Sequence, residues 1–210
     1  MNDDPHGKRE TGAKQISLSG KRIRLRDWVL ADLDEFAYWL QPGHRWQELD
    51  APYYKSTPAN DIPGTIARIR TRIETGNLAV PRQNLIIAHA ENDRLIGQVS
   101  RYWISEETNW LAAGISIYNP ELWSQGYGTE ALGLWTSYLF EAFPSIVRLD
   151  LQTWSGNTGM MRLASKLGFQ LEGRFRNARI VDNTYYDALG YGILRAEWQA
   201  RYPDGFASEG

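Results

Sequence analysis

The chain has 210 residues, of which 42% are hydrophobic and 12% aromatic, so a disordered chain is excluded and one folded domain is favoured. A formal net charge of −2 provides no basic field, which excludes the usual electrostatics of nucleic-acid binding and of binding to anionic membranes. The chain has no Cys, so disulfides and cysteine nucleophiles are not expected, and its three His are too widely separated to suggest a metal site. No apolar run approaches the about 18–20 residues of a membrane span, so a membrane anchor is not expected.

The first residues, MNDDPHGKRETGAK, are charged and contain no apolar signal core. We therefore expect a flexible lead-in over residues 1–15, a cytoplasmic location, and a single domain over residues 16–210. No change in composition and no internal repeat suggests a second domain.

The first half of the chain alternates between strand and helix patterns. Ile23 and Leu25 alternate with arginines, as in a half-buried strand. Apolar spacing then predicts a helix over 30–40, with Leu30 on its apolar face, and another over 59–76. Between these helices, the aromatic and polar segment 44–58 is expected to be a loop.

The second half predicts a meander and a hairpin. Residues 84–118 read as three antiparallel strands joined by the END and SEETN turns. A helix that ends at Pro144, a strand over 146–154, a short helix between Asn157 and Gly168, and a final hairpin with an Asp182-Asn183 turn follow. The fold class is therefore α/β (α+β), with a mixed, mostly antiparallel sheet flanked by helices.

The stretch PELWSQGYGTEAL places Gly126 and Gly128 immediately before one of these helices. A helix start carries unpaired N–H groups and the positive end of the helix dipole, so it attracts phosphate without needing a Lys or Arg. Two glycines permit positive φ and close approach of a ligand. Ser124 and Thr129 add hydroxyl donors. The turn is a candidate diphosphate site, although a glycine pair also occurs in turns that serve packing alone.

Two other phosphate motifs can be compared with this turn. A Walker A loop requires Gly-Lys-Ser/Thr, and the turn has no Lys. Gly126, Gly128 and Ala131 do fit G-x-G-x-x-G/A, with Asp150 downstream as in a dinucleotide site. However, the motif follows an antiparallel meander instead of opening a βαβ unit, which counts against a nicotinamide cofactor.

The order GISIY, NPELWSQGYGTEA, helix, RLDLQTW and NTGMMRLASKLGF resembles the GNAT superfamily of N-acetyltransferases, with the RimJ/RimL-like branch as the closer match. The resemblance spans roughly residues 20–200 and implies a splay between the strands over 114–118 and 146–154. It implies acetyl-CoA as the cofactor, with the pyrophosphate on the backbone of the glycine turn and the pantetheine arm in the splay. It assigns these residues to the cofactor: Ile115, Ile117, Trp123, Ser124, Gln125, Gly126, Tyr127, Gly128, Thr129, Asn157 and Met160. Asn is also a good helix N-cap, so Asn157 has a structural alternative.

The catalytic groups are less clear in the sequence. Members of the superfamily use a Tyr acid at the position of Ala164, and the closer branch a Ser at the position of Met160, so both acids are missing here. A thiolate with a pKa near 8.5 can leave without protonation. Glu107, Asp50 and His89 are candidate bases, of which Glu107 and Asp50 are preferred.

The aromatic residues Trp46, Tyr53 and Tyr54 are expected to shape an acceptor pocket, although they could equally pack as a lid. The resemblance implies acetyl transfer to a primary amine, either a peptide N-terminus or a small molecule, by direct attack in a ternary complex. A non-catalytic acyl-CoA sensor and an NAD-dependent oxidoreductase are the alternatives, and a homodimer is left open.

Overall fold

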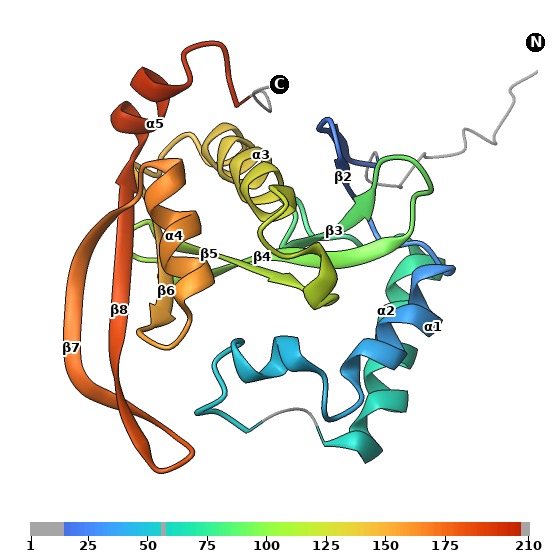
Figure 1. Ribbon diagram of the computed structural model, residues 1–210. Coiled ribbons are helices and arrows are strands. Elements are labelled where there is room, and N and C mark those ends of the chain that lie inside the picture. Colours follow the sequence, from blue (N-terminus) through green and yellow to red (C-terminus); the bar gives the residue numbers. More distant parts are fainter. Residues whose placement is uncertain (1–14, 56–57, 207–210) are drawn as a thin grey trace, which may run out of the picture.

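The computed structural model describes residues 15–55 and 58–206, so the lead-in predicted over 1–15 lies outside this part of the chain except for Gln15. The described residues contain one eight-stranded sheet of order β1-β2-β3-β4-β5-β6-β8-β7 (Figure 1). The strands are β1 Ser17–Ser19, β2 Ile23–Arg26, β3 Asn84–His89, β4 Leu95–Ser105, β5 Trp110–Ile117, β6 Arg148–Trp154, β7 Gln170–Val181 and β8 Thr184–Leu194.

Helices cover both faces of the sheet (Figure 1). One apolar core packs α3 and α4 against the sheet, and a second packs α1 and α2 against the opposite face. The helices of the described residues are α1 Asp32–Leu40, α2 Ile62–Thr75, α3 Tyr127–Ala142, α4 Thr158–Leu167 and α5 Arg195–Arg201, with short 3-10 turns η1 Arg45–Glu48, η2 Ala59–Asp61 and η3 Pro120–Leu122. In the described part of the chain, none of these helices is long and apolar enough to cross a membrane.

The sheet opens between its two central strands. Strands β1 to β5 pair antiparallel, whereas β5 and β6 are parallel and pair only from Leu111↔Leu149 to Ala113↔Leu151. Beyond Ala113, β5 is paired only with β4 among the described strands, while β6 continues along β8 to Trp154. The two strands therefore diverge, as the resemblance implied.

The structure confirms the antiparallel meander, the principal helices and the terminal hairpin. Asp182 and Asn183 have φ angles of 47° and 60°, the left-handed pair that a tight hairpin turn requires. Gly76 and Gly168 end α2 and α4 in left-handed conformations. The prediction for Leu30 was wrong: α1 begins at Asp32, and Leu30 is 46% exposed.

The sequence patterns did not predict some elements, because these are short or depend on tertiary packing. The edge strand β1 has three residues, too few to show alternation, and η1 lies in the segment expected to be a loop. Helix α5 begins directly after β8, and its buried Trp198 packs on the α3 side of the sheet. Its two turns provide too little periodicity to distinguish it from the preceding strand.

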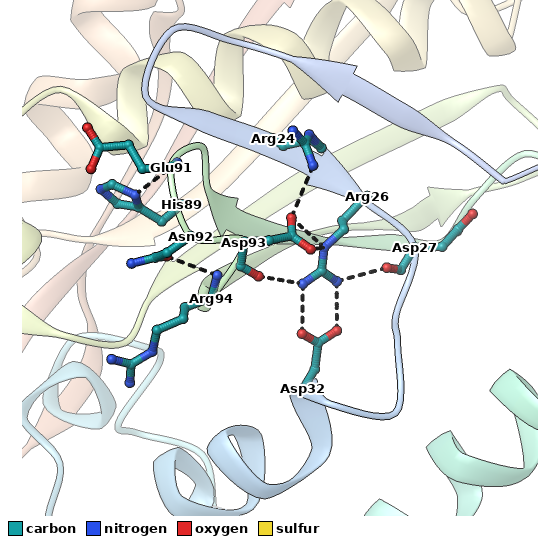
Figure 2. Close-up of polar contacts among 9 residues, drawn as sticks. All are labelled: Arg24, Arg26, Asp27, Asp32, His89, Glu91, Asn92, Asp93 and Arg94. Atoms are coloured by element: carbon teal, nitrogen blue, oxygen red, sulfur yellow. Dashed lines mark hydrogen bonds and ion pairs between the residues drawn. The ribbon is translucent and has the colours of Figure 1, made fainter.

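A buried ion-pair network fixes the start of α1 (Figure 2). The Arg26 guanidinium donates two 2.8 Å hydrogen bonds to Asp32, two of 3.1 Å to the Asp93 carboxylate and one of 2.8 Å to the Asp93 carbonyl. Asp32 also accepts from the Val29 amide at 2.9 Å. Strand β2, helix α1 and the β3–β4 turn are thereby joined through one side chain.

Candidate active site

A pocket of about 640 Å³ lies at the opening between β5 and β6. Its walls come from η1 and the loop after it, the end of β5, the glycine turn, and the start of α4. The residues that line the pocket include Arg45, Trp46, Leu49, Asp50, Ile115, Ser116, Ile117, Trp123, Ser124, Gly126, Gly128, Thr129, Gly156, Asn157, Met160, Arg162 and Lys166.

The glycine turn forms one end of the pocket. Gly126 is the N-cap of α3 with φ +94°, so it adopts a left-handed conformation and has no side chain to cap the helix. Trp123 fixes the approach to the turn because its indole Nε1 donates to the Ile117 carbonyl at 2.9 Å. The first-turn amides of α3 therefore face the pocket end with the positive helix dipole behind them.

The two glycines of this turn differ in what they require: Gly126 has a left-handed backbone (φ +94°) that favours glycine, whereas Gly128 does not. A Cβ on Gly126 would lie 2.4 Å from Nη1 of Arg22, which donates to the Gln125 carbonyl at 2.6 Å. A Cβ on Gly128 would lie 3.4 Å from Leu163 on α4, which is an ordinary van der Waals contact. Gly126 thus serves the local fold as well as leaving the turn open, and Arg22 adds a positive charge beside it.

Two of the cofactor residues assigned from the resemblance are not among the pocket's lining residues. The Gln125 side chain turns back and donates to the Glu121 carbonyl. The Tyr127 hydroxyl lies 3.2 Å from Nε2 of His89, with which it hydrogen-bonds, so His89, too, is directed toward α3. Any contact of residues 125 and 127 with a ligand would be made by their backbone.

The end of β5 presents backbone groups to the pocket. The Tyr118 amide donates to the Ile96 carbonyl at 3.0 Å, so the alternation of an antiparallel ladder turns the amides of Ile115 and Ile117 away from β4. Because β6 has diverged here, these amides face the opening. The side chains of Ile115 and Ile117 pack partly against the α3 core.

Asn157 joins two segments at the pocket wall. Its Oδ1 accepts from the Met160 amide at 3.0 Å, which confirms the N-cap role, and its Nδ2 donates to the Leu49 carbonyl at 3.1 Å. Both polar ends of the side chain are therefore engaged within the protein. A contact between Asn157 and a cofactor would use the remaining Nδ2 hydrogen or the second lone pair of Oδ1.

We expect Asn157→Ala to lower the free energy of unfolding by about 1 kcal/mol, because α4 loses its N-cap acceptor. Urea unfolding at neutral pH measures this change. Asn157→Ser, which keeps an oxygen acceptor, is the matched control and should recover most of the stability. Equal stability of the two variants would show that the cap contributes little.

Asp50 and Glu107 lie at opposite ends of β5. Oδ2 of Asp50 accepts from the Ser116 hydroxyl at 3.4 Å, and the protein atoms around the carboxylate raise its pKa by removing water, an effect that the Ser116 hydrogen bond partly opposes. Glu107 is exposed in the β4–β5 turn, where hydrogen bonds from its own backbone and from Ser105 lower its pKa. The structure does not bring Glu107 to the pocket.

Tyr118 was not identified from the sequence as a functional residue. Its ring is fully buried among Phe36, Trp39 and Trp46, and its hydroxyl has no hydrogen-bond partner among the described residues. Burial raises its pKa well above the ordinary value, and the Asp50 charge acts in the same direction. The signal available in the sequence was the two-residue alternation of a strand, which places Tyr118 on the same face as Ser116.

The three aromatic residues expected around the acceptor separate into two places. Trp46 lines the pocket, and its Nε1 donates to the Trp39 carbonyl at 3.0 Å. Tyr53 and Tyr54 lie further out, where the Arg179 guanidinium of β7 is 4.6 and 6.0 Å from their ring centroids. They are not among the residues lining the pocket.

The charge of the pocket favours an anionic ligand. Arg45, Arg162 and Lys166 line it, and Asp50 is the acidic residue among its lining side chains. The pocket thus combines an open helix start, a splayed strand edge and an excess of positive charge. No group of three His, Asp or Glu side chains that could hold a metal occurs in the described part of the chain.

The amino-acid sequence matches the family model described as "Acetyltransferase (GNAT) domain" over residues 22–170. The uncharacterized N-acetyltransferase YoaA of Bacillus subtilis (strain 168) is 28% identical over 109 residues, which are 52% of this chain and 60% of that protein, so less than two thirds of that relative is spanned. The uncharacterized N-acetyltransferase p20 of Bacillus licheniformis is 25% identical over 183 residues, 87% of this chain and 98% of its own length.

Solved structures share the fold. An acetyltransferase (GNAT family) from Bacillus anthracis superposes with a TM-score of 0.68 at 18% identity, covering 87% of this chain and all of that one. A ribosomal-protein alpha-N-acetyltransferase, RimL, superposes with a TM-score of 0.63 at 13% identity, covering 87% of this chain and 96% of its own.

Proposed function

We propose that this chain uses acetyl-CoA and works by direct attack in a ternary complex. The premise is that the chain belongs to the GNAT acetyltransferase family and is therefore an acyltransferase that acetylates an amine. The observation that carries the proposal is the pocket itself. It joins an open helix N-terminus to a splayed strand edge within one continuous space.

The glycine turn suits the coenzyme A pyrophosphate. Backbone amides from Gln125 to Thr129 would hold it at the start of α3, where the dipole favours negative charge. Arg45, Arg162 and Lys166 on the pocket walls add electrostatic attraction for the phosphates. Trp123, Ser124 and Met160 line the same region and complete this proposed site.

The splay suits the pantetheine arm and the thioester. The amides of Ile115 and Ile117 face the opening and would hydrogen-bond to the arm, as the amides of a free strand edge bind an extended peptide. In such a position an amide also stabilises negative charge that develops on the carbonyl oxygen during attack. These donors belong to a strand that β4 already holds in place, so no reorganisation is needed.

Asp50 is proposed to receive the proton of the attacking amine. The neutral nitrogen then forms a bond to the thioester carbonyl carbon, the C–S bond breaks, and the thiolate leaves with its electron pair. The second proton that the nitrogen loses on becoming an amide passes to the thiolate or to water. Since Ala164 and Met160 offer no acidic hydrogen, the thiolate departs without a side-chain acid at those positions. Ser116 lines the pocket beside Asp50, and its hydroxyl suits the polar end of the acceptor.

The acceptor is proposed to be a primary amine of a peptide N-terminus or a small molecule. A RimL ribosomal-protein acetyltransferase among the structural neighbours supports the first class by analogy alone. We assign the activity to the domain over residues 16–210.

Calorimetric titration with acetyl-CoA, with NADH in parallel, tests the cofactor. We expect saturable binding of acetyl-CoA and no heat with NADH. Release of free thiol in the presence of a panel of amines then tests turnover. Binding without any thiol release above background hydrolysis would favour an acyl-CoA sensor, and NADH binding without acetyl-CoA binding would overturn the proposal.

A further inference from the structure

The Leu49 carbonyl receives hydrogen bonds from two side chains of a distant segment. Trp154 Nε1 and Asn157 Nδ2 each donate to it at 3.1 Å, although they lie 105 and 108 residues further along the chain. Trp154 ends β6, Asn157 caps α4, and Leu49 immediately precedes Asp50. Both donors therefore act on the peptide unit that carries the proposed proton acceptor.

The loop around Asp50 depends on this anchor. Its backbone hydrogen bonds are local: the amides of Leu49 and Asp50 donate to the Trp46 carbonyl, and the Ala51 amide donates to the Leu49 carbonyl. Ala51 has φ 50°, an unfavourable conformation for a residue with a Cβ. A short loop with local bonds and a strained residue requires external contacts to hold one conformation.

The Trp154 indole is itself held in a defined orientation. Its ring meets Tyr186 of β8 edge-on at 4.7 Å, and the ring is 5% exposed. A Cβ on Gly156 would lie 1.9 Å from the indole, so the glycine leaves the space in which the ring lies over the β6–α4 turn. Two neighbours therefore aim the indole N–H at the Leu49 carbonyl.

We propose that Trp154 is a positioning residue, which holds Asp50 beside Ser116 at the acceptor end of the pocket through the Leu49 carbonyl. The inference rests on the proposed function, in which Asp50 receives the proton of the amine. Trp154 does not contact the reacting atoms in this arrangement. Its effect is to keep the carboxylate in one position, where small displacements of a reacting group cost rate.

The charge environment of Asp50 determines how its titration would respond. The groups that face it or share its pocket wall are Ser116 of β5, Tyr118 directly after β5, Arg45 of η1, and Arg162 and Lys166 of α4. Loosening the loop moves the carboxylate away from the protein atoms that desolvate it and raise its pKa. Release of the anchor should therefore lower the pKa of Asp50 toward its ordinary value.

The test compares Trp154→Phe with Trp198→Phe. Phe keeps the aromatic packing and removes the indole donor in each case, and Trp198 Nε1 donates to Ser137 at 3.0 Å in the α3–α5 core, away from the pocket. For Trp154→Phe we expect kcat/KM for the amine to fall about 10- to 100-fold, with unchanged acetyl-CoA affinity. The acid limb of its pH profile should shift to lower pH, while Trp198→Phe should leave that limb in place.

Gly156→Ala provides a second variant, because the added methyl displaces the indole without deleting it. A carboxyl-carbon NMR titration of Asp50 provides a readout that does not need turnover. A lower Asp50 pKa in Trp154→Phe and Gly156→Ala supports the inference, whether or not an acceptor amine is turned over. Absence of turnover by the unmodified protein would count against the proposed function instead. An unchanged Asp50 pKa and pH profile in both variants overturns it.

Discussion

Asp50→Asn is expected to lower kcat/KM for the acceptor amine by about 100-fold or more, since general base catalysis typically contributes this factor. The amide keeps the size of the side chain and its contact with Ser116 but cannot accept a proton from the ammonium. The acid limb of the pH–rate profile that belongs to Asp50 should disappear as well. Steady-state thiol release across the pH range measures both effects, and acetyl-CoA affinity should remain unchanged.

The same substitution should not destabilise the protein at neutral pH. Asp50 has a raised pKa in the fold, so the folded state binds more protons than the unfolded state above the ordinary value of 3.8. Its contribution to stability is present below that value and is lost as pH rises through the folded pKa. Removing the charge removes this loss, so urea unfolding of Asp50→Asn at pH 7 should show equal or greater stability.

Glu107→Gln is the matched control, because Glu107 is an acid at the far, exposed end of β5. We expect its kcat/KM to stay within about twofold, far below the factor for a general base. A large loss in Glu107→Gln with full activity in Asp50→Asn would reverse the assignment of the two candidate bases.

Arg26→Met is expected to lower the free energy of unfolding by about 3–5 kcal/mol, the usual cost of removing one partner from a buried ion pair. The substitution leaves the Asp32 carboxylate, 3% exposed, without its bidentate partner (Figure 2). It also removes the donors to the Asp93 carboxylate and carbonyl. Stabilities of small domains are about 5–15 kcal/mol, so the variant should approach the limit of folding.

Urea unfolding measures this change, and Arg24→Met is the control on the same strand. Arg24 pairs with Asp93 at 3.3 Å, but both side chains are more than 40% exposed. Exposed pairs contribute about 0–1 kcal/mol, so Arg24→Met should unfold close to the unmodified protein. Similar losses in the two variants would mean that burial does not decide the strength of this network.

The local sequence patterns were sufficient for most of the fold. Short apolar runs bounded by turn residues predicted the strands of the meander, of which β3 is buried on both faces. Asp182 and Asn183 marked the hairpin turn because they tolerate the left-handed conformation. The pattern failed at Leu30, where apolar character begins two residues before the helix start at Asp32. A periodic pattern carries no information about such a tertiary ion pair.

The resemblance placed the glycine turn, the end of β5 and Asn157 close together, and the structure lines one pocket with residues of all three. Asp50 could be named from the sequence but not distinguished from Glu107, because each is an acid near a turn. The difference between them is their surroundings: Asp50 lines the pocket and accepts from Ser116 at one end of β5, whereas Glu107 lies in a turn at the other end. Which loop carboxylate lines a pocket depends on how distant segments pack together.

The amino-acid sequence by itself determined most of the elements, their order and the helix start that suits a phosphate, because these depend on neighbours within a few residues. The tertiary structure alone decided that Arg22 lies beside Gly126, that Tyr118 has a buried hydroxyl, and that Trp154 reaches the Leu49 carbonyl. Arg22 and the glycine turn are about a hundred positions apart in the chain, and so are Leu49 and Trp154. Such convergence follows from packing of the whole core, which local periodicity does not encode.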